Sequence, residues 1–264
     1  MALFSPRPSA APQVIWGADL VHWIRFTDFD RSTVLAATPT RVESIRDYSP
    51  QVNSLPCVTS PGTRPTLTTG GINGKGYAQF TSSSSTNLLK ATGFAGMPSG
   101  TGSNGIYCWC VVKFDAASLG NYVMTSTYAQ AAGSYDSGLT LRKNNGNVLQ
   151  WWITFGGGVG LSFITTANTL GSTNTYYLEG WLDQGTKKLN CTINAGTGGN
   201  AAVSASAIST ITTANTIGGA AAGTQVPANT DLFSGRLYEF GLTKAWSSAQ
   251  QATMRSYLQQ FYNL

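Results

Sequence analysis

Hydrophobic and polar residues alternate with a period of two in short segments along most of the chain, a pattern typical of β-strands with one buried face. In KLNCTIN (188–194) every apolar residue is followed by a polar one. Similar segments are VHWIRF (21–26), IYCWCVVKF (106–114) and YYLEGWLD (176–183), with Gly-, Asn- and Ser-rich turns between the strand-like segments. No helical pattern of any length separates them. The pattern therefore predicts an antiparallel β-sandwich rather than a parallel α/β sheet.

One hairpin is predicted in GLTLRKNNGNVLQWWITF (138–155). Matching the apolar faces of its two strands favours a three-residue loop, Asn144-Asn145-Gly146, with Gly146 at positive φ. Trp151 shares the apolar face, so Trp152 points to the other side with the polar Gln150 and Thr154.

The hydrophobic period changes near the C-terminus. Residues 232–242 alternate as a strand, with Tyr238, Phe240 and Leu242 predicted on one side and Leu237, Glu239 and Gly241 on the other. A helix then begins at Ser247 or Ser248, which can cap it. Its apolar face contains Met254, Tyr257, Leu258 and Phe261. A helix of about 14 residues is marginal alone in water, so we expect it to dock on a sheet and cover one edge or end of the sandwich.

Composition narrows the classes of protein. The chain has 264 residues, of which 10% are charged, against roughly 25% in ordinary globular proteins. The net charge is +5, but the 16 basic residues are scattered, so we expect no nucleic-acid binding. No 18-residue apolar run is present, which predicts no transmembrane helix and no membrane insertion.

The first residues, MALFSPRPSAAPQ, contain three prolines and no continuous apolar segment of a signal peptide. We predict an extended N-terminal arm over residues 1–17 that tethers a neighbouring subunit, followed by one domain over 18–264. A disordered terminus is the alternative interpretation of the same residues.

The four cysteines are predicted to be free. Cys108 and Cys110 are two residues apart on one strand, about 6.5–7 Å, which is too far for a relaxed disulfide. Cys57 and Cys191 complete the set, and Cys191 falls on the apolar face of its strand. With His22 as the one histidine, a zinc site is not expected, and His22 itself is predicted to be packed in the interior.

No catalytic residue is predicted. A retaining glycosidase needs two carboxylates about 5 Å apart. Glu179 and Asp183 share a strand face, but they approach the turn at Gln184-Gly185 and are predicted to face solvent. We therefore expect a protein that is not an enzyme, with no metal site and no cofactor.

Several segments together resemble the laminin-G-like, concanavalin-A-like jelly-roll superfamily. The opening ADLVHWIRFTD (18–28) looks like its first strand, and VESIRDYSP (42–50) is similar to a segment in which Ile45 replaces a Trp and Pro50 a Gly. Later matches are RPTL with INGKGYAQF (64–67 and 72–80), TIGG (216–219) and FSGRLYEFGLTKAWSSAQQATMRSYL (233–258). The resemblance implies an all-β, antiparallel jelly-roll sandwich of the concanavalin-A-like type with a short C-terminal helix. Calcium is bound by some members, and Asp47 is the best-placed acid here.

The resemblance does not imply one function, since members include lectins, glycosidases, adhesion modules and phage decoration or fibre proteins. We expect a non-enzymatic phage virion protein, assembled in the host cytoplasm as a head decoration, fibre or tail-associated subunit. Its expected partners are other virion proteins through the arm, copies of itself in a homo-oligomer such as a trimer, and host surface glycans. The alternative is a lectin-like carbohydrate-binding module of a bacterial surface or secreted protein. Trp152, Tyr135 and Tyr48 are the candidate glycan-stacking residues.

Overall fold

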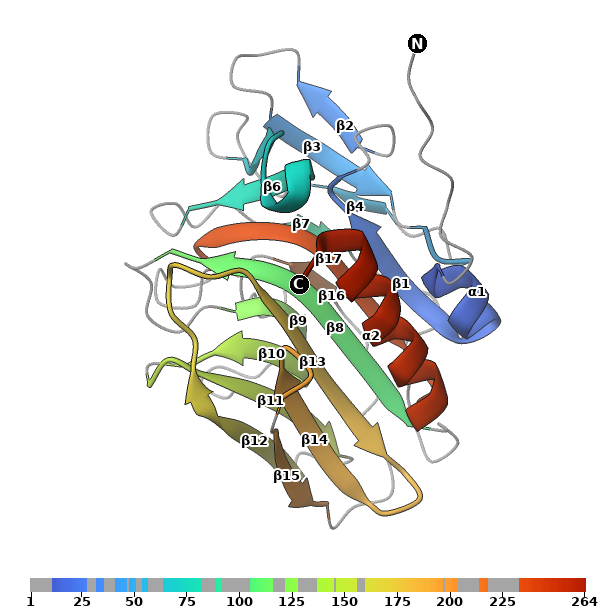
Figure 1. Ribbon diagram of the computed structural model, residues 1–264. Helices are drawn as coiled ribbons and strands as arrows, with labels where there is room; N and C mark the ends of the chain where they lie inside the picture. Colours follow the sequence, from blue (N-terminus) through green and yellow to red (C-terminus); the bar gives the residue numbers. More distant parts are fainter. Residues whose placement is uncertain are drawn as a thin grey trace.

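We describe the protein from a computed structural model (Figure 1). The structure describes residues 11–27, 32–35, 41–46, 48–50, 54–56, 64–81, 89–91, 105–115, 122–127, 137–144, 146–155, 160–196, 198–203, 214–217 and 233–264.

Within these residues, strands account for most of the regular structure. The helices are α1 (Pro12–Trp16) and α2 (Ser248–Tyr262), with 3₁₀ turns at Gly17–Asp19 and Ile72–Gly74. The strands are β1 (Leu20–Arg25), β2 (Ser32–Leu35), β3 (Arg41–Arg46), β4 (Ser54–Pro56), β5 (Thr66–Thr68), β6 (Tyr77–Phe80), β7 (Leu89–Ala91), β8 (Ile106–Phe114), β9 (Tyr122–Thr127), β10 (Ser137–Lys143), β11 (Val148–Phe155), β12 (Gly160–Thr169), β13 (Tyr176–Asp183), β14 (Lys188–Ile193), β15 (Gly199–Ala202), β16 (Ala214–Ile217) and β17 (Gly235–Thr243).

The described strands form two antiparallel sheets. The larger sheet has eleven strands in the order β15-β14-β13-β8-β17-β6-β5-β3-β2, with β1 also beside β17 and β4 beside β3. The smaller sheet has six, in the order β12-β11-β10-β9-β16-β7. Strands distant in sequence are neighbours, as β17 and β8 are, so the chain crosses between the sheets repeatedly. The predicted antiparallel jelly-roll sandwich with a C-terminal helix is confirmed.

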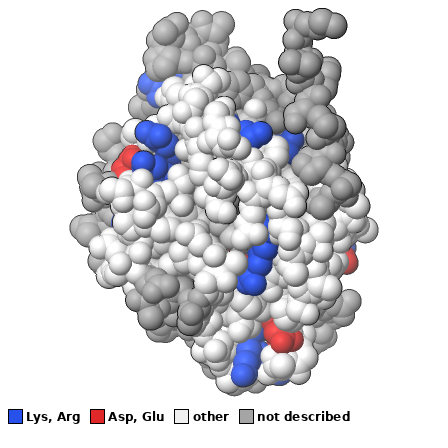
Figure 2. Space-filling view, in the orientation of Figure 1, with Lys and Arg blue, Asp and Glu red and all other residues white. Residues whose placement is uncertain are grey.

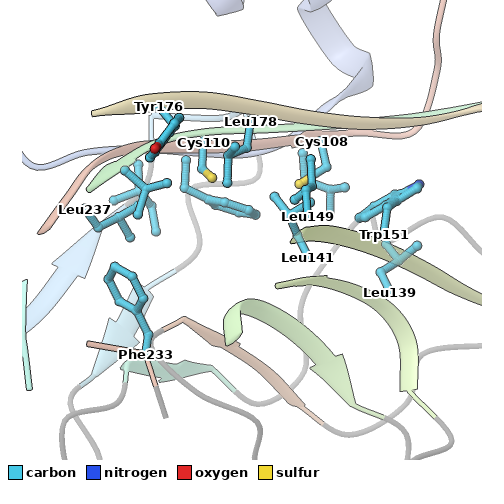
Figure 3. Close-up of a cluster of buried hydrophobic side chains, with 14 of the residues drawn as sticks. Cys108, Cys110, Leu139, Leu141, Leu149, Trp151, Tyr176, Leu178, Phe233 and Leu237 are labelled. Carbon is cyan, nitrogen blue, oxygen red and sulfur yellow. The ribbon is translucent and has the colours of Figure 1, made fainter. Parts of the chain in front are cut away.

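The apolar core lies between the two sheets (Figure 3). The smaller sheet contributes Leu139, Leu141, Leu149, Trp151 and Ile153, all fully buried. The larger sheet contributes Cys108, Cys110, Leu178, Cys191 and Leu237 among others. Cys108, Cys110 and Cys191 are free and buried, as predicted, while Cys57 lies outside the described residues. His22 is also buried, with its ring 5.6 Å from that of Phe240, so the prediction of a packed histidine is confirmed.

A β-bulge in β17 changes the predicted faces of the last strand. Leu237 pairs with Val112 and Glu239 with Val111, so Tyr238 is an extra residue opposite the partner strand. The bulge carbonyl of Tyr238 accepts the N–H of Phe26 at 2.9 Å. Leu237 therefore joins Phe240 in the core, while Tyr238 and Glu239 both face outward, and the prediction that Tyr238 shares a face with Phe240 is wrong.

The β10–β11 hairpin has its loop one residue later than predicted. Lys143 pairs with Leu149, and the N–H of Asn144 reaches the carbonyl of Val148 at 3.0 Å. The residue at positive φ is Asn147 and not Gly146. Asparagine tolerates this backbone conformation better than most residues, so the loop can use it there. The loop starts and ends one residue later than predicted, so each cross-strand partner shifts by two positions. Because side chains alternate with a period of two, the predicted faces of both strands are still correct.

Helix α2 lies across the outer face of the larger sheet, in front of β8 and β17 (Figure 1). Ser247 caps it by accepting from the N–H of Gln250, and the predicted apolar residues Met254, Tyr257 and Leu258 are buried beneath it. The expectation that the helix covers an edge or end of the sandwich is wrong. The outer face carries its own apolar layer, and α2 covers that face instead.

The second half of the predicted N-terminal arm is also packed onto this outer face. Helix α1 spans Pro12–Trp16, and the Trp16 indole stacks on the ring of Tyr107 with centroids 5.4 Å apart. Because this burial needs a fixed backbone, residues 11–17 are not an extended arm. Residues 1–10 lie outside the described residues.

Neither described helix has the length and apolar character that crossing a membrane requires.

Candidate ligand-binding surface

The predicted stacking residue Trp152 lies on the outer face of the smaller sheet, opposite in direction to the buried Trp151. Trp152 is half-buried, and the Arg142 guanidinium lies 4.2 Å from its ring centroid. Arg142 also donates from Nε to Oε1 of Gln150 at 2.7 Å. One ring face is therefore occupied by an arginine of the protein itself, and the role of Trp152 in glycan stacking stays a prediction.

Tyr48 does not present its ring to solvent. It is 6% exposed, and its ring packs 5.0 Å from that of Trp23 while the Arg25 guanidinium lies 5.7 Å from it. The expectation that Tyr48 is an exposed stacking residue is wrong, because its ring belongs to the buried outer layer of the larger sheet and its N–H bonds to the carbonyl of Trp23 at 2.7 Å. Tyr135 and Asp47 lie outside the described residues.

Two carboxylates are fully buried on the outer face of the larger sheet, which the sequence did not indicate. Glu179 accepts from the hydroxyls of Tyr107, Tyr177 and Thr192, from Nε2 of Gln251 at 3.0 Å, and from Nε of Arg255 at 2.8 Å. Gln251 and Arg255 belong to α2, so this carboxylate fastens the first half of the helix to β13. The prediction that Glu179 faces solvent is wrong, because α2 covers its strand face.

Glu239 is the second buried carboxylate. It accepts from Nε1 of Trp23 at 2.9 Å and from the hydroxyl of Tyr262 at 2.8 Å. Tyr257 also donates to it, at 3.3 Å. Burial raises the pKa of Glu239, with the nearby Arg25 charge and the Tyr262 bond acting in the opposite direction.

These two carboxylates do not form a hydrolytic pair. Strand β8 lies between their strands, with Glu179 opposite Trp109 and Glu239 opposite Val111. Two strand spacings and an offset of two residues along β8 place their backbones about 12 Å apart, whereas the carboxylates of retaining glycosidases are about 5 Å apart. Both are surrounded by donors from the protein and covered by α2. Their arrangement holds a helix in place.

Asp183 lies on the same strand face as Glu179 and is partly exposed. Residues of the following turn hold its side chain in place. Its carboxylate accepts from the N–H of Gly185 at 2.9 Å and from the hydroxyl of Thr186 at 2.6 Å. It thus stabilises the β13–β14 connection.

A pair of half-buried tryptophans lies beside the first turns of α2. The rings of Trp181 on β13 and Trp246, just before α2, are stacked with centroids 6.0 Å apart and planes 18° from parallel. Trp246 donates from Nε1 to Oε1 of Gln251 at 3.2 Å, and Gln251 in turn donates to Glu179. Both indoles pack against the buried outer layer on one side and keep part of their surface exposed. Trp181 was not predicted as a site residue, although it lies two positions after Glu179 and strand alternation would put both on one face.

Polar amides continue from the tryptophan pair toward the edge of the sheet. Trp181 pairs with Asn190 on β14, and Asn190 pairs with Asn200 on β15. The intervening alternate residues Cys191 and Ala201 pack toward the core, so Trp181, Asn190 and Asn200 all point outward. We call these three side chains the amide row. Asn190 is half-buried and Asn200 is exposed, so the row is open to solvent where α2 does not cover the sheet.

The charges next to the amide row are compensated. Desolvation acts to lower the pKa of the Arg255 guanidinium, but the hydrogen bond and the charge of its partner Glu179 outweigh it and raise that pKa. Lys188 is opposite Asp183 in the register of β13 and β14, and its charge acts to lower the pKa of that carboxylate. The face that carries α2 is mostly uncharged, with small separate basic and acidic patches (Figure 2). Among the described residues, no group of three or more His, Cys, Asp or Glu side chains is arranged to hold a metal ion.

Comparisons with known proteins give structural neighbours without sequence relatives. No protein-family model matches the chain. The search of curated protein sequences also found no match.

Two similar solved structures are toxin domains. The binding domain of Paraclostridial Mosquitocidal Protein 1 aligns with a TM-score of 0.61 at 11% identity, over 92% of this chain and 52% of that one. The binding domain of Botulinum Neurotoxin serotype G aligns with a TM-score of 0.59 at 9% identity, over 91% and 51%. This chain thus spans about half the length of either toxin chain.

A third similar structure is a variant of the NanB sialidase from Streptococcus pneumoniae, with a TM-score of 0.51 at 14% identity, over 67% of this chain and 27% of that one. At such identities the likeness concerns the fold alone. The chain therefore has the β-sandwich fold found in these toxin binding domains, a lectin-like jelly roll with a helix across its larger sheet.

Proposed function

We propose that the protein is a non-catalytic carbohydrate-binding module and that the stacked tryptophans Trp181 and Trp246, with the adjoining amide row, form its glycan site. The observation that carries the proposal is a partly exposed, stacked tryptophan pair continuous with outward-facing amides. Sugars are bound by such combinations, because their C–H faces stack on aromatic rings and their hydroxyls need both donors and acceptors. An asparagine amide supplies both.

The site is also held rigidly, which favours binding. Trp246 is fixed through Gln251 to the buried Glu179, and Arg255 is fixed to the same carboxylate. Side chains that are already ordered lose little conformational entropy when a ligand binds. The two toxin structures of similar fold are named as binding domains, which is consistent with a binding role for this protein.

A glycan array with the purified protein tests the proposal. We expect binding to a subset of glycans, lowered roughly tenfold or more in a Trp181→Ala variant, since a central aromatic contact is typically worth over 1 kcal/mol. Trp152→Ala is the matched control, because it removes a half-buried tryptophan from the opposite sheet. Loss of binding in Trp152→Ala with retention in Trp181→Ala would move the site to the smaller sheet. An array with no bound glycan would contradict the proposal.

As a second candidate, we propose that the module is carried on a bacteriophage particle as a homo-oligomeric surface subunit. The low charge content and the three reduced, buried cysteines agree with assembly in a host cytoplasm. Residues 1–10 would provide the tether to other virion proteins, since residues 11–17 are used within the domain.

Deleting residues 1–10 tests this second candidate. We expect the deletion to abolish particle or subunit association, measured by sedimentation, while the circular dichroism spectrum and the melting temperature are retained. Association that survives the deletion would rule out the tether. Glycan binding by the truncated protein is expected to be unchanged.

A further inference from the structure

The layout of the amide row points to a specific ligand class, and the inference rests on the function proposed above. We propose that the surface binds the terminal disaccharide of a neutral glycan, with the last sugar ring on Trp181 and the next ring over Asn190 and Asn200. Three features support this ligand class: the pairing of nearby charges, the length of the amide row, and the aromatic side chains that block one end of it.

Charge compensation favours a neutral ligand. Of the charged side chains around the tryptophans, Arg255 and Glu179 bond to each other. Asp183 and the exposed Lys188 lie opposite each other on β13 and β14. A carboxylate or sulfate on the ligand would have to compete with Glu179, a buried partner, for the guanidinium of Arg255. Hydroxyl groups can instead meet the carbonyl oxygen of Asn190 and the exposed amide of Asn200.

The length of the row favours two sugar units. Trp181, Asn190 and Asn200 belong to three adjacent strands, and two strand spacings place the ends of the row about 10 Å apart. Asn190 donates from Nδ2 to the carbonyl of Lys188 at 3.1 Å, which fixes its amide and directs its carbonyl oxygen away from that bond. The second ring can therefore meet an oriented acceptor at Asn190 and an exposed amide at Asn200.

The row is closed on one side and open on the other. Beyond Trp181, the next residue across the sheet is Tyr107, and Trp16 of α1 is stacked on it. Trp246 stands beside the same end through its contact with Trp181. At the opposite end, β15 consists of Gly199, Asn200 and two alanines, and among the described residues no large side chain of this strand closes the row. A glycan can therefore leave over β15 but cannot extend past Trp181, so its terminal unit lies on the tryptophan.

Titration calorimetry with defined sugars tests this inference. The probes are glucose, galactose and N-acetylglucosamine, then lactose, cellobiose, maltose and chitobiose, their trisaccharide extensions, and 3′-sialyllactose with a heparin disaccharide as anionic ligands. We expect at least one neutral disaccharide to bind about tenfold or more tightly than its monosaccharide. Extension to the trisaccharide should change the affinity less than twofold, and the anionic probes should bind more weakly.

Variants separate the two proposals. Asn200→Ala changes an exposed side chain and should reduce disaccharide affinity to the level of the monosaccharide while monosaccharide binding is retained, whereas Trp181→Ala should abolish both. Asn174→Ala, at an exposed asparagine outside the row, is the control. Preference for anionic sugars, a continued gain on extension to the trisaccharide, or no effect of Asn200→Ala would overturn the disaccharide inference and leave the glycan site standing. Binding of no probe would overturn both. The melting temperature of each variant shows whether it is folded.

Discussion

The indole of Trp151 on the smaller sheet lies directly against Gly180 on the larger sheet. A Cβ atom added at Gly180 would be 2.6 Å from Cδ2 of Trp151, closer than real Cβ contacts allow. Trp151 is fully buried, and its strand is fixed on both sides by β10 and β12. The glycine therefore sets the spacing at which the two sheets can pack around the largest residue type of the core.

Gly180→Ala should destabilise the protein by about 1–3 kcal/mol, the usual range when a packed core is overfilled. Urea unfolding followed by tryptophan fluorescence measures the loss. Gly171→Ala is the control, since a Cβ there meets only the Tyr176 hydroxyl, at an ordinary 3.4 Å. In the double variant Gly180→Ala/Trp151→Leu the two effects should be less than additive, because the smaller side chain makes room for the methyl group. Equal stability of Gly180→Ala and the original protein would show that the sheets can separate freely.

Arg255→Ala should destabilise the protein by about 2 kcal/mol. Breaking a buried ion pair typically costs about 3–5 kcal/mol, and the partial exposure of Arg255 reduces this. Glu179 would keep its bonds from Tyr107, Thr192 and Gln251 but lose its cation. The measurement is thermal or urea unfolding, with the exposed Gln259→Ala on the same helix as the control.

A second variant shows whether the buried charge causes the loss. Glu179→Gln/Arg255→Ala removes the charge and its partner together, so it should be more stable than Arg255→Ala alone. If the double variant is the less stable of the two, the carboxylate stabilises the outer layer through its hydrogen bonds even without the cation.

The fold and the inward faces were predictable from sequence because period-two alternation follows directly from strand geometry. Trp151, Leu139 and Cys191 are therefore in the core as expected. The bulge at Tyr238 was not predictable, since one extra residue leaves no mark in the hydrophobic pattern but reverses the faces on one side of it.

The candidate site was largely missed for a different reason. Glu179 was expected to face solvent because alternation along a strand identifies its two faces. It does not show which other elements cover the outer face. The helix that does so is far away in sequence: Gln251 and Arg255 lie more than 70 positions from Glu179. Strand alternation could have placed Trp181 on the face of Glu179, but it was not singled out, and Trp246 lies in a connection that has no hydrophobic period. Only the folded chain brings these two rings together.

The thiols of Cys108, Cys110 and Cys191 should resist modification in the native protein. Burial raises the pKa of all three and brings that of Cys191 to about 12, so little reactive thiolate forms at neutral pH. In a Cys57→Ser variant, which leaves these three thiols, we expect no rapid reaction with a thiol-specific chromogenic reagent at pH 8. Three equivalents should react after denaturation in urea. Rapid labelling of the folded variant would mean that the sandwich opens locally.

Glu239 and Asp183 should give the stability of the protein opposite dependences on pH. Burial raises the pKa of Glu239, so its contribution is fully present below its unfolded pKa of about 4.3 and falls as pH rises through the folded value. Burial also acts to raise the pKa of Asp183, but the bonds from Thr186 and Gly185 outweigh it and lower that pKa. The contribution of Asp183 is therefore present above its unfolded pKa of about 3.9 and is lost as pH falls.

Urea unfolding of Glu239→Gln and Asp183→Asn from pH 3 to pH 7 measures both effects against the original protein. The stability of Glu239→Gln relative to the original should increase with pH, because the cost of the buried charge is absent from the variant. The stability of Asp183→Asn should decrease with pH over the same range, because the variant lacks the favourable ionised form. The two variants therefore serve as controls for each other. Relative stabilities that run in the same direction for both would mean that pH acts through other groups, and that Glu239 is not penalised for its charge under α2.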